Sequence, residues 1–152
     1  MPHYRYNDDK PIADATEREI ARNFETRYGH RVVAYDHTNK YDLEIVTRKG
    51  KVFTVEVKED FTCERTGNIG LEFECRGKPS GISVSKSSHY LYKVHCPDGM
   101  IRFYIIKTDE LRKMIEEKSY SRVVSGGDKG SNSMNYLWPL GVFAKSATQI
   151  FN

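Results

Sequence analysis

Apolar residues follow helical spacing in one part of the chain and strand spacing in most of the rest. Ile20, Phe24 and Tyr28 recur at helical spacing and predict a helix over residues 15–28. Thr16 and Glu19 stand at the two positions of a capping box at the start of this helix. A helix with one apolar stripe buries that stripe against another layer, so the pattern favours a helix packed on a sheet.

Short runs rich in β-branched and aromatic residues predict the strands of this sheet. They are 31–36, 41–47, 51–59, 89–95 and 100–107, with 69–75 as an extra strand or an extended flap. A serine-rich stretch at 82–88 predicts a short helix capped by Ser80 or Ser83, and Thr108 is expected to cap a helix over 109–118. The predicted fold class is therefore α/β, with a mixed central sheet flanked by helices.

The run 51–59, KVFTVEVKE, places charge in the middle of a strand. At the two-residue strand period Glu56 and Lys58 share one face, while Val55 and Val57 share the other. The preceding turn makes a hairpin with 41–47 and brings Asp42 near Glu56 on the neighbouring strand. The ordinary alternative is a solvated strand face with a weak Glu/Lys pair.

The chain has 152 residues, of which 38% are hydrophobic, enough for the core of a single domain over 1–152. Residues 1–13 are polar and proline-punctuated and predict a loose N-terminal lead-in. The low-complexity stretch 125–135 predicts a flexible loop. Residues 136–152 contain enough apolar area to dock on the domain or on a second subunit.

Composition excludes several classes of protein. Charged residues make up 30% of the chain, and no run of residues is apolar enough to span a membrane or to serve as a signal peptide, so a soluble cytoplasmic protein is expected. Its three cysteines have no zinc-binding spacing and are odd in number, which argues against a zinc site and against a disulfide framework. The net charge of +3 does not by itself indicate a nucleic-acid binder.

An acid on the first helix, an aspartate on the second strand and Glu-x-Lys on the third resemble the PD-(D/E)XK nuclease superfamily. The resemblance covers about residues 15–94 and is nearest to Holliday-junction-resolvase-like and phage-encoded members. Glu17 stands in the register of the family's helix acid, and Glu19 does not. Asp42 is similar to the motif aspartate, although Tyr41 stands where the family name has proline.

The resemblance implies a restriction-endonuclease-like core of order αβββαβ and a metal-dependent DNA endonuclease. Glu17, Asp42, Glu56 and Lys58 would be the catalytic residues, and Asp42, Glu56, the Val57 carbonyl and Glu17 would hold Mg²⁺ or Mn²⁺. Hard oxygen ligands suit Mg²⁺, and a lysine beside the ion can orient the attacking water. No organic cofactor is implied.

Further residues are candidates through their position along the chain. Basic or polar residues that could contact DNA are Arg48, Lys49, Lys51, Lys78, Ser85 and Lys86. Second-tier candidates for the metal site are Asn68 and Glu72, for which a plain surface strand is the alternative. His89 and His95 have no evident acid partner in the sequence and are interpreted as structural.

The expected partner is DNA, branched DNA included, because the nearest members of the superfamily resolve junctions as symmetric dimers. A homodimer formed through the apolar segment 136–152 is expected on the same ground. Restriction-like or nicking activity on duplex DNA is the alternative within the class. A binding module that keeps the fold without turnover, and an interaction protein, are the alternatives outside it.

Overall fold

The computed structural model describes residues 6–35, 41–125 and 132–152, and for 6–13, 34 and 35 it describes the backbone alone. In chain order the elements are α1 (Tyr6–Tyr28), β1 (Arg31–Tyr35), β2 (Leu43–Val46), β3 (Val52–Asp60), α2 (Cys63–Thr66), β4 (Asn68–Cys75), β5 (Lys78–Pro79), the 3₁₀ turn η1 (Gly81–Ser83), β6 (His89–His95), β7 (Ile101–Lys107), α3 (Thr108–Glu116), β8 (Arg122–Ser125), β9 (Ser133–Pro139), α4 (Leu140–Ser146) and β10 (Thr148–Ile150).

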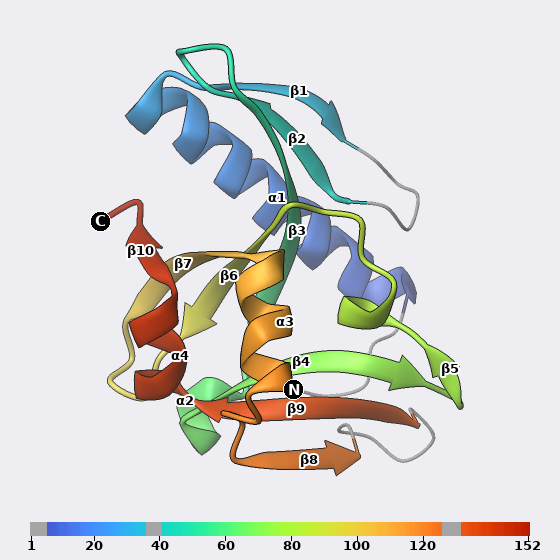
Figure 1. Cartoon of the computed structure of the whole chain (residues 1–152). Helices are drawn as coiled ribbons and strands as arrows, with labels where there is room; N and C mark the ends of the chain where they lie inside the picture. Colours follow the sequence, from blue (N-terminus) through green and yellow to red (C-terminus); the bar gives the residue numbers. More distant parts are fainter. Residues whose placement is uncertain (1–5, 36–40, 126–131) are drawn as a thin grey trace.

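The strands form two sheets, and the predicted α/β class is confirmed. The central sheet has the order β1-β2-β3-β6-β7-β10, in which β3 and β6 run parallel and the other neighbours run antiparallel. A second, antiparallel sheet has the order β5-β4-β9-β8. Figure 1 shows α1 along β1–β3 and the second sheet at the opposite end of the molecule from the β2–β3 turn.

The two faces of the central sheet are covered by two separate cores. The α1 core lies beneath the first helix and contains Ile20, Phe24, Leu43, Ile45, Val55, Leu91 and Phe151. The second core joins the opposite face to α3, α4 and the second sheet, and includes Ile69, Leu71, Tyr90, Tyr92, Leu111, Trp138 and Phe143. Residues on β6 alternate between the cores, because successive side chains of a strand point to opposite faces.

The first helix begins earlier than the sequence pattern predicts. α1 starts at Tyr6, so residues 6–13 of the predicted lead-in are helical, and residues 1–5 lie outside the described part. Thr16 is consequently in the middle of the helix, and the predicted capping box with Glu19 does not exist. The Thr16 hydroxyl instead donates a hydrogen bond to Glu59 on β3, and the Glu19 carboxylate contacts Lys93 on β6.

Two other helix predictions are wrong in part. The segment 82–88 forms only the short turn η1, so the helix expected before β6 in the αβββαβ order is missing. Serine side chains compete with the helical backbone for hydrogen bonds, and Ser83 Oγ donates to the Phe73 carbonyl at 2.8 Å. Thr108 is the first residue of α3 rather than its cap, and its buried hydroxyl has no partner among the described residues.

The C-terminal segment packs on its own domain. Trp138 and Phe143 are fully buried in the second core, and Phe151 closes the α1 core. These side chains are therefore not available for the subunit interface predicted over 136–152. The predicted loop 125–135 is shorter, because Ser125 belongs to β8 and residues 133–135 belong to β9, while 126–131 lie outside the described residues.

None of the helices in the described part of the chain is long and apolar enough to cross a lipid bilayer.

Candidate active site

The β2–β3 hairpin brings Asp42 and Glu56 together. Its register pairs Leu43 with Val55, so Asp42, just before β2, falls beside Glu56. The Asp42 amide donates to the Val55 carbonyl at 2.9 Å, and the Val57 amide donates to Asp42 Oδ2 at 2.8 Å. The aspartate is therefore fixed to the third strand at both its backbone and its side chain.

Alternation along the strands places these acids on the face that α1 does not cover. Leu43 and Val55 are fully buried in the α1 core, and Val57 packs against it. Glu56 and Lys58 consequently point to the opposite face, as the two-residue period predicts. The apolar face of the hairpin packs on the α1 core, and the charged side chains lie on its other face.

The surroundings of the Glu56 carboxyl group disfavour its ionised form. Burial, the largest cause, and a hydrogen bond with the Asp42 carboxyl group together raise its pKa from an ordinary 4.5 to about 8. Lys58 opposes this rise, while the charges of Asp42 and Glu17 add to it. Near neutral pH the Glu56 carboxyl group therefore keeps its proton beside Asp42.

Helix α1 contributes the third acid of the cluster. Ile20 and Phe24 are buried against the sheet, and Glu17 lies three and seven residues before them on the same side of the helix. Its charge acts on Glu56, which places it at the site. Glu19, which did not fit the helix register, pairs instead with Lys93 at 2.7 Å.

A second polar cluster, which sequence reasoning missed, joins α1 to β3 and β6. Glu59 accepts a hydrogen bond from Thr16 and lies 2.7 Å from His95 Nε2 and 3.7 Å from Lys93 Nζ. The Glu59 side chain is only 11% exposed. His95 therefore has an acid partner after all, although one that lies 36 residues away and leaves no local signal. The cluster fixes Thr16, and with it the adjacent Glu17.

Tyr90 is the neighbour of Glu56 on β6 and was not predicted as a site residue. The parallel register pairs the two residues directly, and both lie on the same face of the sheet. Burial raises the pKa of Tyr90 to about 12, so its hydroxyl keeps its proton. This hydroxyl is buried, and a side-chain hydrogen bond with Ser85 opposes the rise in its pKa. It is a hydrogen-bond donor close to the acids.

The donor set at this site suits a hard divalent cation. The Glu56 carboxyl group, which keeps its proton near neutral pH, would ionise beside a cation, since an opposite charge lowers a carboxyl pKa. Among the described residues no three His, Cys, Asp or Glu side chains are grouped closely enough to hold a metal ion. The pair fits Mg²⁺ better than Zn²⁺, because Mg²⁺ keeps several waters and needs few protein ligands.

The segment before β6 is built differently from the predicted phosphate-binding helix. Arg112 donates to the carbonyls of Ile82 and Ser85 at 3.3 and 3.0 Å, and tethers the segment to α3. Ser85 is 5% exposed and its hydroxyl pairs with that of Ser87, so little of this side chain is accessible, and its contact with DNA stays a prediction. Lys86 is exposed.

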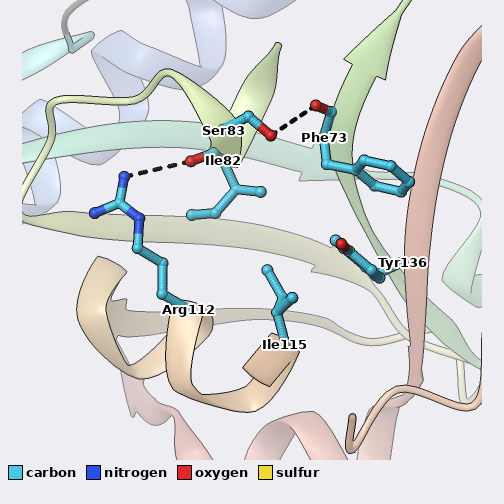
Figure 2. Close-up of a pocket in the computed structure, with 6 residues that line it drawn as sticks. All are labelled: Phe73, Ile82, Ser83, Arg112, Ile115 and Tyr136. Atoms are coloured by element: carbon cyan, nitrogen blue, oxygen red, sulfur yellow. Dashed lines mark hydrogen bonds between the residues drawn. The ribbon is translucent and has the colours of Figure 1, made fainter. Parts of the chain in front are cut away.

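A pocket of about 210 Å³ lies beside this tether, between η1, α3 and the second sheet. Figure 2 shows its lining, with Ile82 and Ile115 between Arg112 and the paired rings of Phe73 and Tyr136. The two ring centroids are 4.3 Å apart. None of its lining residues is among the acids of the candidate site.

Most of the predicted basic contacts lie away from the acids. Arg48, Lys49 and Lys51 lie at the β2–β3 turn. Four paired residues of β2 separate this turn from Asp42, which corresponds to about 13 Å along the strand. The Arg48 side chain lies against Gly29 at the end of α1, where an added Cβ would be 2.9 Å from Arg48 Cδ. Lys78 is exposed on β5 in the second sheet.

The second-tier metal candidates both belong to β4 in the second sheet. Asn68 pairs with Pro139 and Glu72 with Asn135 across the β4–β9 ladder. The charges that act on Glu56 come from Lys58, Asp42 and Glu17. The extra strand itself is confirmed, and a metal-binding role for these two residues stays a prediction.

Comparison with known proteins gives little support to any assignment. No known protein-family model matches the chain, and no curated protein matches it. Among solved structures, the chain is similar to a bacterial homing endonuclease, I-Ssp6803I. The alignment covers 67% of this chain and 70% of the endonuclease chain, with a TM-score of 0.44 and 21% sequence identity. Because both the TM-score and the identity are low, this likeness carries no argument about the function of the chain.

Proposed function

We propose that this protein is a metal-dependent DNA endonuclease whose active site is formed by Glu17, Asp42, Glu56 and Lys58. The observation that supports the proposal is the contact between the Asp42 and Glu56 carboxyl groups on a partly buried strand face, where Glu56 has a raised pKa. A protein has no structural need for two adjoining carboxyl groups there, because each costs free energy to bury. A bound cation would compensate for this cost, because it stabilises the ionised carboxylates.

The carboxylates of Asp42 and Glu56 would hold Mg²⁺ or Mn²⁺, together with the carbonyl of Val57. The Val57 amide already points to Asp42, and in an extended strand the carbonyl of a residue points to the same neighbour as its amide. The ion would supply positive charge at the phosphate and a bound water of lowered pKa. Glu17 on α1 would accept hydrogen bonds from waters bound to the ion and so orient them.

Lys58 is the residue that would face the substrate without binding the ion. It shares the strand face of Glu56, and its charge lowers the Glu56 pKa, so its ammonium group lies near the acids. A cation at this position orients the attacking water and stabilises the negative charge that develops on the phosphate oxygens. Its expected role is in turnover rather than in binding.

Within this proposal the substrate is DNA with a junction or another branch, with ordinary duplex as the alternative. The panel that distinguishes them consists of a four-way junction, a flap, a linear duplex, a single strand and supercoiled plasmid. Each is incubated with Mg²⁺ or Mn²⁺ and with EDTA. Cleavage in metal and none in EDTA is expected, and cleavage of the junction alone would assign a resolvase-like activity.

The matched variants are Glu56→Ala at the site and Glu44→Ala on β2. Glu44 lies on the same face of the hairpin, opposite Thr54, and outside the proposed ligand set. Glu56→Ala should abolish cleavage, whereas Glu44→Ala should retain it. Equal nicking by wild type and Glu56→Ala would mean that a contaminant cuts the DNA. DNA binding without cleavage by the wild type in every metal would assign a binding module.

A further inference from the structure

A second cavity, of about 420 Å³, lies at the end of β3 beyond the candidate active site. Its walls come from the end of β3 and the turn that follows, from α2, and from the second sheet. The lining residues are Glu59, Asp60, Phe61, Thr62, Arg65, Thr66, Gly70, Val124, Asn135 and Leu137. Asp60 follows Lys58 by two residues and shares its strand face, about 6.6 Å further along.

We propose that this cavity, which we call the base pocket, receives one unpaired nucleobase of the DNA next to the bond that is cut. The proposal rests on the endonuclease function proposed above and narrows its substrate to DNA with an unpaired or extrahelical nucleotide. The cavity volume lies within the range of about 300–1,000 Å³ that is typical of small-molecule sites.

Electrostatics favours a neutral base over a phosphate in this pocket. Two carboxylates line it, and both are already satisfied within the protein. Asp60 Oδ1 accepts from the Cys63 amide at 2.9 Å and Asp60 Oδ2 from the Gly70 amide at 3.2 Å, while Glu59 accepts from Thr16. They need no cation, and they would repel an anion, while Arg65, the basic residue of the lining, is exposed to solvent.

The side chains that remain suit a planar, hydrogen-bonding ring. Phe61 stacks on His95 with centroids 4.4 Å apart, which fixes the plane of its ring, and aromatic rings of this kind bind unstacked bases of any sequence. The Asn135 amide offers a donor and an acceptor, as a base edge requires, and its hydrogen bond to Ser133 Oγ is long at 3.5 Å. Val124 and Leu137 supply apolar walls.

Gly70 forms part of the floor of the pocket and makes a sharp test. A Cβ at this position would lie 3.6 Å from Leu137 Cδ2 and 3.9 Å from Asn135 Oδ1, in ordinary van der Waals contact with two pocket residues. Gly70→Ala therefore fits, and the two further methyl groups of Gly70→Val extend into the space for the base. Gly141→Ala is the matched control, because an added Cβ there meets nothing within 4 Å.

The experiment compares two DNA duplexes that differ only in the presence of a base. Each contains a single-nucleotide bulge, with a normal base in one and an abasic site in the other, and affinities are measured by fluorescence anisotropy in Ca²⁺ to prevent cleavage. The wild type should bind the base-containing bulge at least about tenfold more tightly, since stacking alone contributes a factor of this order. Gly141→Ala should keep this ratio.

Gly70→Val and Asn135→Ala should lower the ratio toward one while the affinity for the abasic bulge stays unchanged. The abasic duplex thereby reports folding of each variant, and Asn135→Ala leaves the backbone at Gly70 untouched. A wild-type ratio near one in a protein that binds and cuts DNA would overturn the base pocket and leave the endonuclease standing. A tenfold ratio that survives both variants would also overturn it. Failure to bind or cut any DNA would overturn both proposals together.

Discussion

The raised pKa of Glu56 predicts that this protein loses stability as the pH rises through neutrality. The pKa of Glu56 rises from 4.5 to about 8 on folding, chiefly through burial. Between these two values the folded protein binds a proton that the unfolded chain has released, so the free energy of unfolding falls with increasing pH. The loss begins near pH 4.5 and levels off above pH 8.

The magnitude follows from linkage. One pKa unit corresponds to about 1.4 kcal/mol, which gives a ceiling of about 5 kcal/mol for the whole effect. From pH 6 to pH 8 the loss amounts to about 2 kcal/mol. For a protein of this size, 1 kcal/mol shifts Tm by about 2–4 °C, so Tm should fall by roughly 4–8 °C over this interval.

The assay is thermal unfolding of wild type and Glu56→Gln at pH 6, 7 and 8 with EDTA. Glutamine keeps the shape and cannot ionise, so the Tm difference between variant and wild type isolates the contribution of this group from all others that titrate. The difference should grow by the same amount, roughly 4–8 °C, from pH 6 to pH 8. Glu44→Gln, the same change on the neighbouring strand, should leave the pH-dependent loss in place.

Magnesium supplies the second arm of this experiment. A ligand that binds only the folded protein stabilises it, by about 1.4 kcal/mol at ten times its dissociation constant. The gain in Tm should be larger at pH 8 than at pH 6, because a bound cation must displace the Glu56 proton, and it should vanish in Glu56→Gln. A Tm difference that does not change with pH would show that the folded protein does not hold Glu56 protonated, and the reasoning for a metal site would fail.

Other residues of the site give further predictions. Lys58→Ala should lower single-turnover cleavage a hundredfold or more with little change in DNA affinity, and turnover within a few-fold of wild type would refute its role. Tyr90→Phe removes a donor beside Glu56 and should raise the pH at which Mg²⁺ begins to stabilise the protein, with an unchanged pH profile as the contrary result. Glu59→Gln should cost about 1–3 kcal/mol in urea unfolding because it weakens a buried network with Thr16 and His95. DNA affinity should fall steeply with salt, with a slope near −0.9 per phosphate contacted, and a flat dependence would exclude DNA as the ligand.

Local patterns in the sequence were sufficient for the hairpin and its acids. Alternation fixes which face of a strand a side chain occupies, and a tight turn fixes which residues oppose each other, so Asp42, Glu56 and Lys58 could be placed together. Glu17 could be chosen over Glu19 for the same reason, since helical spacing from Ile20 and Phe24 is also local. The placement of these side chains was therefore predictable from short-range order.

Contacts between distant segments were not predictable. The hydrogen bond from Thr16 to Glu59 joins residues 43 apart, and the pairing of Glu59 with His95 joins residues 36 apart. Neither leaves a periodic signal. Thr16 looked like a helix cap because the residues before it are polar, yet the helix continues through them. The base pocket was equally hidden, because Asn135 and Gly70 meet only through the β4–β9 ladder.

That ladder also sets the order in which the protein can fold during its synthesis. β4 pairs with β9, whose residues follow about 60 to 70 positions later in the chain. At typical translation rates of about 5–20 residues per second, β4 waits roughly 3–14 s for its partner. During that time Ile69 and Leu71 have no sheet to cover them, while the β2–β3 hairpin and α1 can already associate. The acids are thus assembled early, and the wall beside them is completed last, when Trp138 leaves the ribosome.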